Sequence, residues 1–226
     1  MRGTSTVFIV DQDRSFRDTV RDIVDGLGLD SQLFTCGSEF IDGYDAALRG
    51  CLVAELLLPD MTTPQLLMAL RDRDVEIPTI VATADSEVAM AVAAMRAGAI
   101  TCLRKPCCPG ELASLVREAI RHDLERSKKK ACRREIQQRL DCLTADETKT
   151  MNMVIQGVAN KVIARRLNVS MRTVEARRQR VLWKMGVDTA PELAQLVTWY
   201  RGDAPVLLRH LEIEPDFQTA IGTKGC

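Results

Sequence analysis

Short apolar runs alternate with amphipathic stretches through the first half of the chain, and this alternation limits the possible folds more than any other feature. The runs are predicted to be strands at 6–10, 31–35, 51–55, 79–83 and 100–104. The stretches between them place apolar residues at helical spacing, as at Phe16, Val20 and Val24. A helix after each strand predicts an α/β domain with a doubly wound, five-stranded parallel sheet.

The residues that follow the predicted strands suit one kind of chemistry. They are carboxylates, an amide, a hydroxyl and an amine: Asp11, Gln12, Asp13, Glu55, Thr83 and Lys105. In a doubly wound sheet these positions meet at one rim, and such groups can handle phosphate together with a hard cation. A cofactor domain of flavodoxin type has the same architecture, but it needs an anion-binding loop where this chain has carboxylates that repel phosphate.

The second half of the chain predicts an all-α domain of four helices. Thr144 with Glu147 forms a capping box, and Ser170 is placed to cap a helix that is rich in arginine. The short helix before it ends at a three-residue turn, 168–170. Two helices across such a turn, the second of them basic, predict a helix-turn-helix that binds the major groove of DNA.

Charge divides the chain into segments although its net charge is zero. Residues 1–123 hold 12 basic and 19 acidic residues, whereas residues 124–140 hold 7 and 2, and residues 141–202 hold 10 and 6. This asymmetry predicts that the second half meets a polyanion. We expect four segments: an α/β domain at 5–123, a basic helical linker at 124–136, a helix-turn-helix domain at 137–202 and a tail at 203–226.

Longer motifs resemble two known families. The segments VFIVDQDRSFRD, GCLVAELLLPDM, IPTIVATADSEVAMAVAAMRAGA and LRKP are similar to the receiver domain of two-component response regulators, which has a flavodoxin-like fold. The segments NKVIARRL, VSMRTVEARR and KMGV are similar to the LuxR/FixJ-type DNA-binding domain. Together they make the chain resemble one response-regulator transcription factor up to about residue 202.

The resemblance also indicates a receiver that departs from its family. Glu55 stands at the position of the phosphorylated Asp, and Gln12 replaces an acidic magnesium ligand, while Asp11, Asp13, Thr83 and Lys105 remain. Cys102 stands at the aromatic switch position, and the bond from Lys105 to Pro106 is expected to be cis. We therefore expect weak or absent magnesium binding and no aspartyl phosphorylation. Glu55 either mimics the phosphorylated state or marks a site that has drifted into a dimerisation module.

The resemblance assigns roles on the arginine-rich helix. Glu175, Ala176 and Gln179 are expected to face bases. The residues expected at phosphates or in the helix cap are Lys161, Ser170, Arg172, Thr173, Arg178 and Lys184, and Arg177 stands where the family commonly has His. Trp183, Trp199 and Tyr200 are expected in the core or at a dimer contact, with stacking on bases as the alternative.

These features predict a dimeric regulator of transcription that binds double-stranded DNA and is not an enzyme. A histidine kinase or another protein is a possible partner. We expect no metal, cofactor or membrane contact and a cytoplasmic location, because no long apolar stretch or signal segment occurs and the eight cysteines have no zinc spacing. Two alternatives remain open: a thiol-based redox regulator that uses Cys102, Cys107 and Cys108, and an interaction adaptor with vestigial DNA binding.

Overall fold

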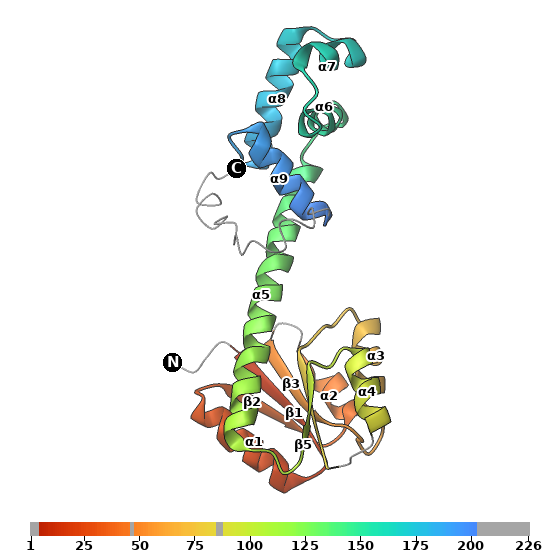
Figure 1. Cartoon of the computed structure of the whole chain (residues 1–226), viewed down its shortest axis with the longest axis vertical. Coiled ribbons are helices and arrows are strands. Elements are labelled where there is room, and N and C mark those ends of the chain that lie inside the picture. Colours follow the sequence, from red (N-terminus) through yellow and green to blue (C-terminus); the bar gives the residue numbers. More distant parts are fainter. Residues whose placement is uncertain (1–4, 46–47, 85–87, 203–226) are drawn as a thin grey trace. The chain divides into compact units, whose positions relative to one another are not determined.

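The computed structural model describes residues 5–45, 48–84 and 88–202, and these divide into two compact units near residue 128. Each unit is described by itself (Figure 1). The predicted tail at 203–226 lies outside the described residues.

The N-terminal unit contains the five-stranded parallel sheet that the alternation predicts. Its strands are β1 Ser5–Val10, β2 Asp30–Phe34, β3 Arg49–Glu55, β4 Thr79–Thr83 and β5 Thr101–Arg104. They lie in the order β2-β1-β3-β4-β5, and every neighbouring pair is parallel. The predicted doubly wound α/β fold is thus confirmed. The strand order reverses beside β1. The carboxyl ends of β1 and β3 therefore flank the crevice in which doubly wound folds place their ligand-binding sites.

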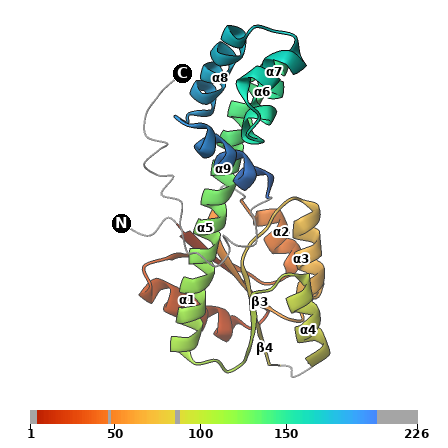
Figure 2. The ribbon, with the colours of Figure 1, turned by 45° about the horizontal axis from the view of Figure 1, so that its top comes forward.

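Helices cover both faces of this sheet (Figure 2). They are α1 Arg14–Gly26, α2 Gly37–Gly43, α3 Thr63–Asp72, α4 Val88–Ala97 and the first part of α5 Pro109–Asp141. Alternate strand residues enter separate cores, as the two-residue period of a strand requires. Val7 and Ile9 pack with α1 and α5, whereas Phe8 and Val10 pack with α2, α3 and α4.

The C-terminal unit is all helical and forms around one core. Its helices are the last turns of α5 with α6 Ala145–Ile155, α7 Asn160–Leu167, α8 Met171–Met185 and α9 Ala190–Arg201. The predicted linker at 124–136 belongs to the single helix α5, and Ile136 is only 2% exposed in the core of this unit. The C-terminal end of the predicted linker is therefore part of the packed C-terminal unit.

Local signals in the sequence fix the ends of these helices. The Thr144 capping box is confirmed, with Glu147 N donating to Thr144 Oγ1 and Thr144 N donating to Glu147 Oε2. Ser170 caps α8 by accepting from Thr173 N at 3.1 Å. Asn168 ends α7 and Gly186 ends α8, both in the left-handed conformation.

Candidate functional site

The rim of the sheet brings three of the predicted site residues together. Lys105 Nζ lies 2.5 Å from Asp11 Oδ2 and 2.5 Å from Glu55 Oε2. The three side chains come from the carboxyl ends of β1, β3 and β5, which the parallel topology places at the same edge of the sheet. One ammonium group thus pairs with two carboxylates in an ion-pair triad of Asp11, Glu55 and Lys105, whose net charge is −1 when all three groups are ionised.

Burial and local hydrogen bonds hold this triad in place. Asp11 is 1% exposed, and burial raises the pKa of its carboxyl although the Lys105 hydrogen bond opposes that rise. Asp11 Oδ1 also accepts from Asp13 N at 2.8 Å, and Glu55 Oε1 accepts from Leu56 N at 2.8 Å. The ammonium of Lys105 lies 4.0 Å from the centre of the Phe16 ring. The predicted cis bond between Lys105 and Pro106 is confirmed.

The other predicted rim residues lie around the triad. Gln12 is exposed, and Asp13 caps α1 by accepting from Ser15 N at 2.9 Å. Thr83 is buried, and its carbonyl accepts from Lys105 N at 2.8 Å. Cys102 is half-buried and packs against the core on the α3 and α4 face. The carboxylate of Asp13 is thus occupied at a helix start.

The triad does not fit a divalent cation. Within the part of the chain that the structure describes, no three His, Cys, Asp or Glu side chains are grouped so that they could hold a metal. The carboxylates of Asp11 and Glu55 each have one oxygen engaged by the ammonium of Lys105, and the neighbouring position is the neutral amide Gln12. A hard cation needs several oxygen ligands, and here the best two are engaged.

The thiol environment differs from what the redox alternative requires. A reactive cysteine needs a lowered pKa, which a nearby cation such as Lys105 could give to Cys107. Burial instead raises the pKa of Cys107 above its ordinary value despite Lys105, and burial and Glu55 raise the pKa of Cys102. Cys51 is fully buried, with a pKa raised to about 12. These three thiols have the character of apolar packing residues.

Helix α8 presents a polar face away from the core of its unit. Val174, Val181 and Met185 are buried on one side of the helix. The predicted base-facing residues Glu175, Ala176 and Gln179 are exposed, as is Arg172 in the first turn. Thr173 lies at the cap, where its hydroxyl is 2.8 Å from Ser170 Oγ, and Lys161 on α7 is exposed.

Four basic residues of α8 have partners inside the unit, and one of them, Arg180, has its Nε 3.9 Å from Glu147 Oε1. Lys184, predicted to contact a phosphate, instead donates to Glu147 Oε2 at 2.7 Å and to the Cys142 carbonyl at 2.9 Å. Glu147 is 3% exposed, and these bonds hold the pKa of its carboxyl below its usual value. The structure therefore gives Lys184 a bracing role between α6 and α8, because a buried carboxylate needs a counter-charge.

The remaining two arginines also bridge helices. Arg177, at the position where the family commonly has His, pairs with Asp146 of α6 at 2.5 Å. Arg178 Nη1 donates to Asn160 Oδ1 of α7 at 2.9 Å. Both guanidinium groups have further donors that can meet a phosphate, but part of their function is to fix α8 against α6 and α7.

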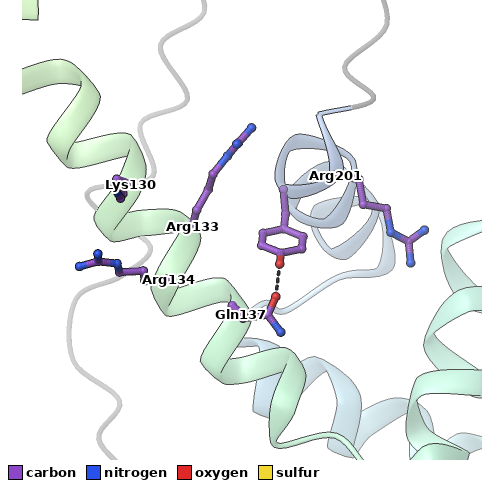
Figure 3. Close-up of a pocket in the computed structure, with 6 residues that line it drawn as sticks. Lys130, Arg133, Arg134, Gln137 and Arg201 are labelled. Carbon is purple, nitrogen blue, oxygen red and sulfur yellow. Dashed lines mark hydrogen bonds between the residues drawn. The ribbon is translucent and has the colours of Figure 1, made fainter. Parts of the chain in front are cut away.

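Two features of the C-terminal unit did not follow from the sequence. Trp183 is 71% exposed on α8, which excludes the core position that was one of the expectations for it. A shallow basic groove lies between α5 and α9, and its lining residues are Lys130, Arg133, Arg134, Gln137, Tyr200 and Arg201 (Figure 3). Tyr200 donates to Gln137 at its floor. The basic run at 124–140 indicated this charge but not its partner α9.

Comparison with known proteins matches both units. Residues 7–117 match the response regulator receiver domain, and residues 141–197 match the bacterial regulatory proteins of the luxR family. The transcriptional regulatory protein FixJ of Bradyrhizobium diazoefficiens is 30% identical over 190 residues, which cover 84% of this chain and 93% of FixJ. The C4-dicarboxylate transport transcriptional regulatory protein DctR of Rhodobacter capsulatus is 33% identical over 193 residues, 84% of this chain and 98% of DctR.

Solved structures of two response regulators are also similar to this chain over most of its length. The response regulator StyR has a TM-score of 0.79 and 30% identity, with 88% of this chain and 100% of StyR covered. Full-length FixJ from B. japonicum has a TM-score of 0.54 and 29% identity, with 89% and 98% covered. No helix in the described ranges is both long enough and apolar enough to cross a membrane.

Proposed function

The chain belongs to the FixJ-type response regulators, DNA-binding transcriptional regulators with a receiver and a LuxR-type helix-turn-helix, and we propose that its receiver works without phosphorylation. In this proposal, the regulator binds its operator as a homodimer in the cytoplasm. Receivers are generally phosphorylated by a histidine kinase. Here a signal other than phosphate from such a kinase sets the activity.

The observation that carries the proposal is the ion-pair triad. Lys105 contacts Glu55 and Asp11 at 2.5 Å each, and in the receiver family the residue at position 55 is the Asp that takes the phosphoryl group. The longer carboxylate of Glu55 reaches the lysine without any phosphate. It supplies one negative charge where a phosphoryl group would supply about two.

In this proposal, the receiver site also lacks free ligands for a magnesium ion. In-line phosphoryl transfer depends on a metal that neutralises the developing charge and on placement to within about 1 Å. Gln12 is neutral, Asp13 caps α1, and Lys105 occupies the two remaining carboxylates. The triad therefore supports the mimic of an activated state better than the drifted site, since all three partners remain paired.

DNA binding is assigned to α8 and its surroundings. Glu175, Ala176 and Gln179 form the base-reading set, while Arg172 and Lys161 contact phosphates. The dimer is supported by an apolar stripe on α4, where Val88, Val92 and Met95 are 74%, 43% and 43% exposed at a spacing of four and then three residues.

Selection of binding sites from random duplex DNA tests this function. The native protein, never treated with a phosphodonor, should enrich a defined sequence, and its affinity should fall steeply with salt as counterions are displaced. Arg172→Ala should weaken binding to all duplexes and reduce the salt dependence. A native protein that retains no duplex at low salt would favour the adaptor alternative.

A further inference from the structure

We propose that Trp183 is a DNA-contacting residue, whose indole packs on the deoxyribose wall of the major groove beside the base-reading residues. This inference rests on the proposed DNA binding by α8 and extends it to a residue of a different chemical class. The observation behind it is an indole that is 71% exposed, the most exposed large apolar side chain of α8, where Met171 at the helix start is 44% exposed.

Trp183 lies on the same face of α8 as three of the residues assigned to DNA. Arg172, Ala176, Gln179 and Trp183 follow one another at intervals of four, three and four residues, which places them on one stripe of an α-helix. All are exposed, and the buried residues Val174, Val181 and Met185 lie on the opposite side. The indole therefore shares the face that meets DNA.

The charge of this face identifies the occupant. Arg172 lies on the same stripe, and Arg180 is 60% exposed beside it, three residues before Trp183. A second copy of α8 would bring the same positive charges against this surface, and like charges would repel. A polyanion is attracted by both arginines, so that the duplex fits the face better than another protomer does.

The distance along the helix identifies the part of the duplex. Trp183 lies four residues, or about 6 Å, beyond Gln179 towards the carboxyl end of α8. A recognition helix reads base edges with its N-terminal residues, and its later turns leave the base pairs. The indole then meets the wall of the groove, where deoxyribose rings offer apolar surface. Such a contact contributes affinity without reading sequence.

Three variants of the full chain test this inference on a duplex selected from random DNA and on a scrambled duplex of equal length. Trp183→Ala should bind both about tenfold more weakly, the effect of burying a modest apolar area. The slope of affinity against salt should be unchanged, because an indole displaces no counterion. Trp183→Phe should retain most of the affinity, since it keeps an apolar ring.

The third variant provides a direct signal. Trp183 and Trp199 are the two tryptophans of the chain, so Trp199→Phe leaves Trp183 as the only indole, and its fluorescence should change when duplex is added. Native affinity in Trp183→Ala, no fluorescence change in Trp199→Phe, or equal losses in Trp183→Ala and Trp183→Phe would overturn the inference. Failure of the native protein to bind either duplex would instead overturn the proposed DNA binding itself.

Discussion

At the scale of single residues, the receiver rim depends on the balance between one amine and its carboxylates. Glu55→Asp shortens the carboxylate and frees space near Lys105, but Gln12 still supplies no charge for a magnesium ion. We expect little labelling by acetyl phosphate in the native chain or in Glu55→Asp. Labelling should appear when Gln12→Asp is added, as intact-mass measurement would detect. Labelling of Glu55→Asp alone would mean that Asp13 leaves its capping position to bind the metal.

A second residue-scale prediction concerns Lys184. Its removal takes the nearest counter-charge, at 2.7 Å, from the carboxylate of Glu147, which is 3% exposed, and leaves the longer contact of 3.9 Å with Arg180 Nε. Lys184→Ala should destabilise the C-terminal unit by about 1–3 kcal/mol, the range for losing a hydrogen bond to a charged group. Arg172→Ala is the matched control, because Arg172 is exposed and should leave stability nearly unchanged. Urea unfolding followed by tryptophan fluorescence reports this unit alone, since both tryptophans belong to it.

The same ion pair gives the unit a dependence on pH. The pKa of Glu147 is held below its ordinary value by Lys184 and by the Thr144 backbone. Its ionised form therefore contributes stability that is fully present above the unfolded pKa of about 4.3 and is lost as the pH falls through the lowered value. Glu147→Gln should flatten this acid-side decline. An unchanged decline in that variant would assign it to other groups.

At the scale of elements, the glycines that follow α6 and α8 should differ in how well they tolerate a side chain. Gly157 and Gly186 both have positive φ, 72° and 67°, where a side chain costs about 1–2 kcal/mol. A Cβ at Gly157 meets nothing within 4 Å, whereas a Cβ at Gly186 would lie 2.5 Å from Arg139 Nη1, which donates to the Met185 carbonyl at 2.8 Å. Gly186→Ala should cost about 1 kcal/mol more than Gly157→Ala, because that hydrogen bond must shift. Equal losses in urea unfolding would show that Arg139 moves freely.

The helices and strands also show which structural features could be predicted from the sequence and which could not. The alternation of apolar runs predicted all five strands, and the capping residues Thr144 and Ser170 predicted the starts of α6 and α8, because these signals are local. The role of Lys184 was not predictable, since its partner Glu147 is 37 residues away. The sequence left Trp183 open between the core and an exposed contact for a related reason: hydrophobicity alone favours burial, and only the packed helix shows which side is covered.

At the scale of the whole molecule, two units of opposite charge share one chain. The first carries the triad, in which Lys105 offsets part of the negative charge of the rim, and the second carries the basic helix α8 and the groove between α5 and α9. Because the C-terminal unit supplies the positive charge, DNA affinity should not require any change in the receiver. Phosphorelay regulators, by contrast, depend on a new charge at the receiver rim.

The measurement that tests this account most directly is the affinity of the native chain for its selected duplex before and after treatment with acetyl phosphate and magnesium, with intact mass recorded on the same samples. We predict an unchanged mass and an unchanged Kd, because Lys105 already pairs with Glu55 and Asp11. A mass increase of one phosphoryl group together with a tighter Kd would contradict the account and return the protein to the phosphorelay.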